Sequence, residues 1–113
     1  MAPAYDRDMS GGVRRHTRKS GGIYQCLAEV VIVNIKGLHA RASAIFVKTA
    51  EKYDAEILVT KDDQTVNGNS IMGLLMLGAA KGSTILIETS GSDAEDALDA
   101  LIKLVEGKFN EEA

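Results

Sequence analysis

GLHARASAIFVKTAEKY, residues 37–53, is the stretch that decides the fold. Its apolar and small side chains recur every three or four residues, and they are Ala42, Ile45, Phe46, Thr49, Ala50 and Tyr53. This spacing predicts an amphipathic helix of about three turns that packs one face on a core. The helix is expected to begin near His39, because Gly37 permits a tight turn just before it.

Extended segments lie on both sides of this helix. Apolar side chains alternate along residues 26–32 and again along residues 55–61, a period that is typical of strands with one buried face. Residues 62–64 then form a polar turn and residues 65–67 a short return strand. Together they predict a hairpin after the first helix.

The second half of the chain repeats the alternation of helix and strand. Residues 70–77 predict a short helix, and residues 84–89 predict a strand. Ser92 and Glu95 have the spacing of a capping box, which predicts the start of a last helix that ends at Gly107. That helix carries a clean apolar stripe, made of Ala97, Leu98, Leu101, Ile102 and Val105.

The resulting order, β-α-β-β-α-β-α, indicates an α+β fold. We expect an open-faced β-sandwich, in which three helices cover one face of a four-stranded, mainly antiparallel sheet and the other face meets water. The ferredoxin-like fold shares most of this order, and element order alone does not separate the two.

Charge and composition divide the chain into two parts. The 113 residues suffice for one domain. Residues 1–22 carry five basic and two acidic side chains, contain two Gly-Gly pairs and show no apolar period, so we expect a disordered arm. Residues 23–113 carry eight basic and fourteen acidic side chains and are expected to form the domain.

Several classes of function are disfavoured by the same composition. An acidic domain argues against nucleic acid as the main ligand, because phosphate contacts need a basic surface. Cys26 is the only cysteine, so we expect no internal disulfide and no cysteine-based metal cluster. We also expect no cofactor. No apolar run approaches the roughly 20 residues of a membrane span, and no signal-peptide pattern precedes the domain. We therefore expect a cytoplasmic protein that does not enter a membrane.

A histidine stands where the first helix begins. Helix N-termini present free N–H groups and a partial positive charge, and they commonly bind phosphate. Neutral imidazole is a nucleophile near pH 7, which makes His39 a candidate phosphoryl acceptor. Arg41 can fold back toward the same point, where its guanidinium would stabilise the phosphate. A plain helix-capping or surface histidine remains the alternative, whereas a metal site is disfavoured because the only other histidine, His16, lies in the arm.

The motif around His39 points to a known family. GLHAR, residues 37–41, resembles the active-site motif of the HPr phosphocarrier family of the bacterial phosphoenolpyruvate:sugar phosphotransferase system. A second family segment follows as NSIMGL at residues 69–74 and LGAAKG at residues 77–82, so the resemblance spans about residues 24–107. It implies a phosphocarrier and not an enzyme. It also implies that enzyme I phosphorylates His39 at Nδ1, that Arg41 stabilises the phosphate, and that an enzyme IIA-type domain receives it.

Some positions depart from the family pattern. Ala42 stands where the family often has Pro, and Lys36 stands where many members have a small polar capping residue. Ala42 followed by Ser43 resembles the nitrogen-related branch, which implies regulation as the end point in place of sugar transport. Residues 1–22 have no family counterpart.

The second predicted helix carries two further expectations. Ser70 suits an N-cap, and the resemblance implies that it is also a regulatory phosphorylation site for an HPr kinase/phosphorylase. Because the helix is apolar around nearly its whole circumference, we expect Leu74 and Leu77 in the core and an exposed patch beside them. That patch is expected to dock enzyme I and enzyme IIA, and it consists of Ile71, Met72 and Leu75.

Three other functions would fit a domain of this size. An acylphosphatase-like hydrolase would need an arginine-lined anion loop and a residue that positions water. It would not need a histidine at the start of a helix. A purely regulatory relative would lack His39, and a nucleic-acid module would use the basic arm. Since carriers exchange partners quickly, we expect a monomer that forms transient complexes.

Overall fold

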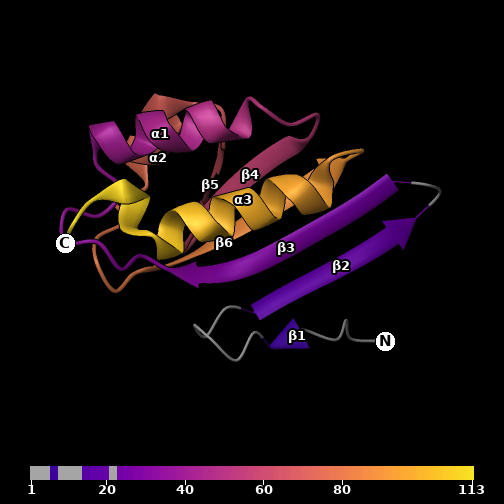
Figure 1. The fold of residues 1–113 in the computed structure, drawn as a ribbon, viewed down its shortest axis with the longest axis horizontal. Coiled ribbons are helices and arrows are strands. Elements are labelled where there is room, and N and C mark those ends of the chain that lie inside the picture. The colour runs from indigo at the N-terminus through magenta and orange to yellow at the C-terminus, as the bar shows by residue number, and fades with distance from the viewer. Residues whose placement is uncertain (1–5, 8–13, 21–22) are drawn as a thin grey trace.

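The computed structural model describes residues 6–7, 14–20 and 23–113, which form a twisted sheet with helices packed on one face (Figure 1). The strands are β1 (Asp6–Arg7), β2 (Arg14–Ser20), β3 (Ile23–Val31), β4 (Glu56–Lys61), β5 (Gln64–Asn67) and β6 (Thr84–Gly91). The helices are α1 (Ala40–Ala50), α2 (Ile71–Met76) and α3 (Ala94–Glu106), followed by the short 3-10 helix η1 (Lys108–Asn110).

The sheet has the order β1-β2-β3-β6-β4-β5, and every neighbouring pair is antiparallel. Ile87 of β6 lies at its centre, opposite Ala28 of β3 and Val59 of β4. The α+β open-faced sandwich expected from the sequence is therefore confirmed.

The core lies between the helices and the sheet, and it is almost entirely aliphatic. Every second side chain of the central strands is buried in it, namely Cys26, Ala28, Val30, Ile57, Val59, Ile85 and Ile87. The predicted stripe of α3 is also buried, and Phe46 of α1 and Phe109 of η1 are the largest fully buried side chains. Burial of a side chain of this size stabilises the fold by about 1.5–3 kcal/mol.

The sheet has six strands and not the four that the sequence predicts. The two additional strands come from the predicted arm, and β2 pairs with β3 through seven residue pairs. Arg15 of β2 also forms an ion pair with Asp99 of α3. The prediction of disorder is therefore wrong for residues 6–7 and 14–20, while residues 1–5, 8–13 and 21–22 lie outside the described residues.

The physical reason for this error is the position of β2 at the side of the sheet. Figure 1 shows β1 and β2 extending beyond the part of the sheet that α1 and α3 cover. A strand there does not need an alternating apolar pattern, because pairing of its backbone N–H and C=O groups with β3 suffices to hold it.

The start of α3 also differs from expectation. The helix begins at Ala94 after the N-cap Asp93, and no capping box forms. Ser92 instead donates a 2.8 Å hydrogen bond to the Asp54 carboxylate, and Asp93 accepts a 2.7 Å hydrogen bond from the Asp54 N–H. The Ser92 hydroxyl therefore connects the end of β6 to the segment before β4. In a capping box, the same hydroxyl would instead bond to the first turn of α3.

Within residues 6–7, 14–20 and 23–113, no helix combines the length and the apolar character needed to cross a membrane. The same part of the chain contains no group of three or more His, Cys, Asp or Glu side chains that could hold a metal ion.

Removal of residues 1–20 is expected to make the Cys26 thiol more reactive. Cys26 is buried, burial raises the pKa of its thiol, and Thr17 of β2 is its partner across the strand pair. Without β2, access to the sulfur increases, so a small disulfide reagent should react faster at fixed pH. The check is the rate of thiol release from the shortened and the full-length chain. Equal rates would mean that β2 does not shield this residue.

Candidate functional site

The loop between β3 and α1 is held in a tight turn. Gly37 has a φ of +66°, and a Cβ atom at this position would lie 2.5 Å from the carbonyl oxygen of Ala79. The side-chain amide of the fully buried Asn34 donates a 2.8 Å hydrogen bond to the Gly37 carbonyl. The Leu38 N–H donates a 2.8 Å hydrogen bond to Ala79, so the turn is attached to the segment that follows α2. Only glycine satisfies both the left-handed backbone and this close approach.

His39 is the N-cap residue of α1, as the sequence predicts. Its backbone is extended, its carbonyl accepts a 2.8 Å hydrogen bond from the Ser43 N–H, and its ring makes no capping hydrogen bond. The first amides of any helix lack intrahelical acceptors, and the first turn of α1 contains no acidic residue to neutralise them. The ring of His39 therefore stands beside a positively polarised helix end.

Arg41 lies in that first turn and is exposed to solvent. In the part of the chain that the structure describes, no carboxylate forms an ion pair with its guanidinium. The structure thus brings His39 and Arg41 to the same helix end, and it leaves the arginine available for an incoming anion.

Glu111 is the site residue that the sequence did not reveal. Its Oε2 atom contacts Nε2 of His39, and its Oε1 atom accepts a 2.9 Å hydrogen bond from the Asn34 amide. The Asn34 hydrogen bond, and secondly the one with His39, hold the pKa of the Glu111 carboxyl below its ordinary value. His39 and Glu111 lie 72 residues apart in the chain, and no local sequence pattern singles out Glu111 from its neighbour Glu112.

The contact with Glu111 leaves one nitrogen of the ring available. Among the described residues, Nδ1 of His39 has no hydrogen-bond partner, whereas Nε2 is engaged. A neutral imidazole that donates through Nε2 carries its lone pair on Nδ1. In this arrangement Nδ1 is the ring nitrogen that remains open to an incoming group.

The predicted second helix has a clear division between buried and exposed sides. Ser70 caps α2 by accepting a 3.0 Å hydrogen bond from the Gly73 N–H, and Leu74 and Leu77 are buried, as predicted. We call the exposed side of this helix, beside α1, the α2 patch. It consists of Ile71, Met72 and Met76, which are 40%, 69% and 67% exposed, while Leu75 is half-buried.

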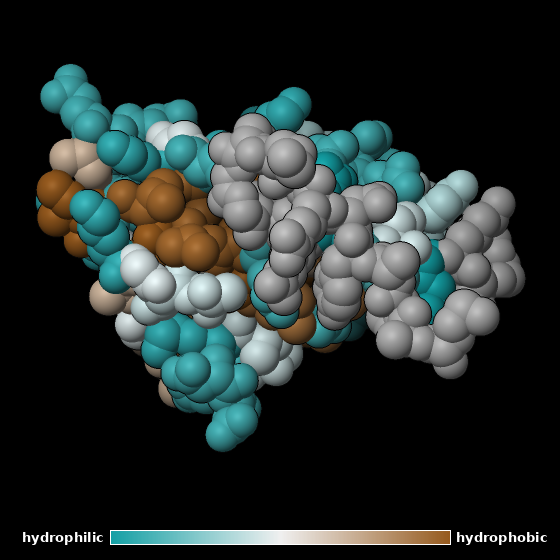
Figure 2. Space-filling view, turned by 90° about the horizontal axis from the view of Figure 1, so that it is seen from below, coloured by the Kyte–Doolittle hydropathy of each residue, from teal (hydrophilic) through white to brown (hydrophobic). Residues whose placement is uncertain are grey.

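Apolar surface also gathers near the site loop. Figure 2 shows hydrophobic residues toward the end of the molecule at which β3 ends and the C-terminus lies. Val31 and Ile35 are exposed large hydrophobic side chains of this region. The Ile35 N–H donates a 3.2 Å hydrogen bond to Ala113, which fastens the last residues of the chain to the loop that carries His39.

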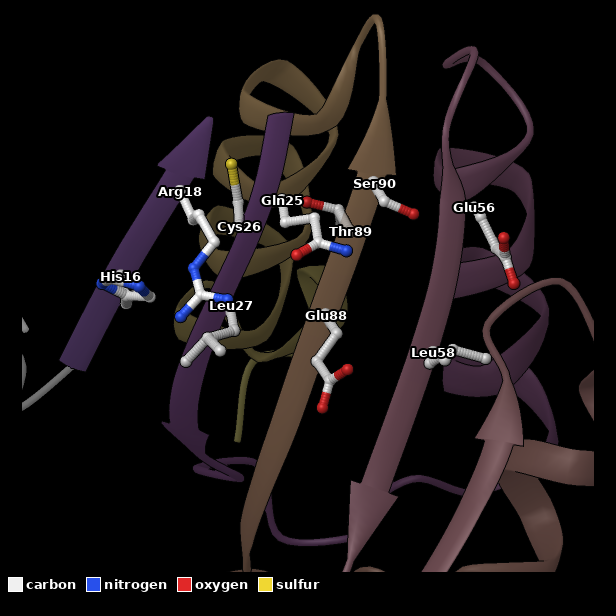
Figure 3. Close-up of a pocket in the computed structure, with 10 residues that line it drawn as sticks. All are labelled: His16, Arg18, Gln25, Cys26, Leu27, Glu56, Leu58, Glu88, Thr89 and Ser90. Atoms are coloured by element: carbon white, nitrogen blue, oxygen red, sulfur yellow. The ribbon is translucent and has the colours of Figure 1, made fainter. Parts of the chain in front are cut away.

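A shallow hollow lies on the open face of the sheet, away from His39. Figure 3 shows its lining on β2, β3, β6 and β4, with Arg18, Leu27, Glu88 and Leu58 among the labelled side chains. None of the site residues predicted from the sequence lines this hollow.

Comparison with known proteins identifies the family. The profile of the PTS HPr component phosphorylation site matches residues 27–107. The phosphocarrier protein HPr of Neisseria meningitidis serogroup A is 52% identical over 82 residues, covering 73% of this chain and 92% of that protein. The phosphocarrier protein NPr of Shewanella violacea is 42% identical over 83 residues, covering 74% of this chain and 91% of that one.

Solved structures agree with the sequence matches. The crystal structure of HPr-C-His from Thermoanaerobacter tengcongensis aligns with a TM-score of 0.74 and 44% identity, covering 77% of this chain and 98% of that chain. The fold and these matches define a small phosphocarrier protein, and not an enzyme that turns over a substrate of its own. The chain belongs to the HPr family of the phosphotransferase system.

Replacement of Gly37 by alanine is expected to destabilise the protein more than the same change at Gly78. Both glycines have a positive φ, +66° and +59°, but a Cβ atom at Gly78 meets no other atom within 4 Å. Left-handed strain costs about 1–2 kcal/mol at either position, and the clash with Ala79 adds to it at Gly37 alone. Urea unfolding of G37A and G78A measures the difference, and equal losses would contradict the clash.

The contribution of Glu111 to stability is expected to depend on pH. Because its pKa in the folded protein is lowered from 4.5, its ionised form favours folding. The stabilisation is present above pH 4.5 and is lost as the pH falls through the folded-state pKa. Unfolding curves of the wild type and of E111Q should therefore differ at pH 7 and converge in acid. E112Q, a change at the exposed neighbouring residue, is the control and should unfold like the wild type at pH 7.

Proposed function

We propose that His39 accepts a phosphoryl group from enzyme I, which is charged by phosphoenolpyruvate, and passes it to an enzyme IIA-type acceptor. The observation that carries this proposal is the position of the His39 ring at the start of α1, with Nε2 on Glu111 and Nδ1 available. Membership of the HPr family supports the same chemistry.

The transfer step follows from these groups. The lone pair of Nδ1 attacks phosphorus, the new P–N bond forms, and the bond to the donor breaks with its electron pair. The free amides of the first turn of α1 face the negative oxygens of the transferred group. Arg41 is placed in the same turn and is assigned the role of stabilising the phosphate through paired hydrogen bonds.

The α2 patch is assigned to partner docking. Its exposed methionines adapt to surfaces of different shape, which suits a carrier that binds a donor and an acceptor in turn. The patch retains the predicted Ile71 and Met72, includes Met76, and has the half-buried Leu75 at its side. The proposal includes a cytoplasmic location and a monomer that forms transient complexes.

The acceptor belongs to either the sugar branch or the nitrogen-related branch. The residues after Arg41 resemble the nitrogen-related branch, and a protein named NPr lies among the relatives at 42% identity. Acceptor domains of both branches therefore belong in a transfer assay.

Incubation with phosphoenolpyruvate and enzyme I is expected to add one phosphate to the chain. The modification should be acid-labile, and intact-mass measurement should find it in the wild type and in H16A but not in H39A. The R41A variant should gain the phosphate more slowly, because the negative charge at phosphorus loses a partner. Phosphate on H39A, or none on the wild type, would contradict the proposal.

Phosphorylation of Ser70 by an HPr kinase/phosphorylase is the regulatory part of the proposal. The Ser70 hydroxyl lies at the N-terminus of α2, next to Ile71 of the patch, and a phosphate there would add about two negative charges. Charge at this point is expected to weaken docking of a partner with an acidic surface.

The Ser70 hypothesis is tested by titrating enzyme I into the S70E and S70A variants. S70E should bind more weakly than the wild type. S70A should keep its affinity while losing about 1 kcal/mol of stability, since it lacks only the cap. Unchanged affinity of S70E would remove the regulatory role.

A further inference from the structure

We infer that Glu111 is a positioning residue for phosphoryl transfer, whose carboxylate keeps the proton of the His39 ring on Nε2 and the reactive lone pair on Nδ1. This inference rests on the proposed role of His39 as the phosphoryl acceptor. It assigns a function to a residue that lies beyond the 27–107 segment matched by the family profile.

The first support is the geometry of the carboxylate. Its two oxygens have different partners, since Oε1 accepts from the Asn34 amide at 2.9 Å and Oε2 contacts Nε2 of His39. Asn34 is completely buried, and its amide nitrogen also donates to the Gly37 carbonyl. Because two oxygen acceptors face that nitrogen, the orientation of the amide is determined, and the amide in turn orients Glu111.

The second support is the path of the chain that delivers Glu111. Three consecutive residues, Lys108, Phe109 and Asn110, have positive φ values of 58°, 54° and 65°. Such a backbone costs energy at each non-glycine residue and persists only where the surroundings enforce it. Phe109 is buried, and the Ile35 N–H holds Ala113 on the other side of Glu111. The end of the chain is thus fastened on both sides of the carboxylate.

The third support is the chemistry of the pair. An ionised carboxylate only accepts hydrogen bonds, so the ring nitrogen that faces it carries the proton. A glutamate carboxyl is ionised at neutral pH, and the hydrogen bonds from Asn34 and His39, which lower the pKa of Glu111, favour that ionised form further. The opposite tautomer would place a lone pair against a negative charge, and it would leave Nδ1 protonated and unable to attack.

The same contact balances charge during the transfer. When the Nδ1 lone pair forms the bond to phosphorus, the ring becomes cationic while the Nε2 proton stays in place. The bond from phosphorus to the donor breaks, and its electron pair leaves with the donor. Glu111 then faces a positive ring, and a charge-assisted hydrogen bond of this kind is stronger than a neutral one. Glu111 therefore favours the loaded state as well as the reactive tautomer.

The experiment compares the full-length wild type with E111Q, E111D and the control E112Q. Nitrogen NMR of the His39 side chain gives the tautomer populations, and it requires no donor. Quenched-flow mass measurement gives the rate of transfer from phosphorylated enzyme I. A folded spectrum of each variant is the condition for comparing them, because a misfolded protein would lose both readouts.

E111Q is expected to show a mixture of tautomers, because the side-chain amide both donates and accepts. Its transfer rate should fall by roughly tenfold, because the charge-assisted hydrogen bond to the ring is replaced by a neutral one. E111D should recover part of the tautomer preference and part of the rate, and E112Q should match the wild type.

Unchanged tautomers in E111Q would overturn the inference. So would a slower rate without a change of tautomer, since it would assign Glu111 to partner docking. A wild-type chain that takes no phosphate on His39 would instead overturn the proposed function itself. The NMR measurement separates the two failures, because it reports on the contact without any transfer.

Discussion

The close backbone approach at Gly37 is the constraint on which the rest of the site depends. It lets the Leu38 N–H reach the Ala79 carbonyl, so the loop before α1 and the segment after α2 are joined at one point. A Cβ atom at this position would lie only 2.5 Å from the Ala79 carbonyl oxygen and would clash with it. The turn therefore determines where α1 begins, and through α1 it determines where the ring of His39 stands.

Around this turn, the buried residues that support the loop are distinct from the residues that solvent and other molecules can reach. The aliphatic core between the helices and the sheet is buried. At its border, the buried Asn34 side chain donates hydrogen bonds to the Gly37 carbonyl and to the Glu111 carboxylate, and so holds the loop in place. His39 and Arg41 are left at the surface of a well-supported helix end. The proposed carrier role requires this combination, because a ring that accepts and passes on a phosphoryl group must be held in a defined orientation and still be reached by a donor and an acceptor.

The edges of the molecule are where sequence patterns were least informative. β2 was expected to be disordered because its sequence shows no alternation of apolar and polar side chains. Its backbone nevertheless pairs with β3, and Arg15 forms an ion pair with Asp99. Ser92 was expected to cap α3, yet its hydroxyl is used by Asp54 from another part of the chain. The contacts of Arg15 with Asp99 and of Ser92 with Asp54 join residues that are distant in sequence, so no local pattern could report them. The pairing of β2 with the adjacent β3 is local, but it uses backbone groups and so requires no apolar side-chain period.

The sequence by itself determined the order of the elements from β3 to α3, the buried stripe of α3, the capping roles of His39 and Ser70, and the motif that names the family. These features depend on neighbours within about four residues, and periodicity and capping chemistry report such neighbours directly. Only the tertiary structure decided that β2 joins the sheet, that Met76 is exposed while Leu75 is half-buried, and that Glu111 reaches His39. The physical reasons are that β2 is held by backbone pairing, which leaves no side-chain period, and that the contact between His39 and Glu111 arises only when packing brings together residues 72 positions apart.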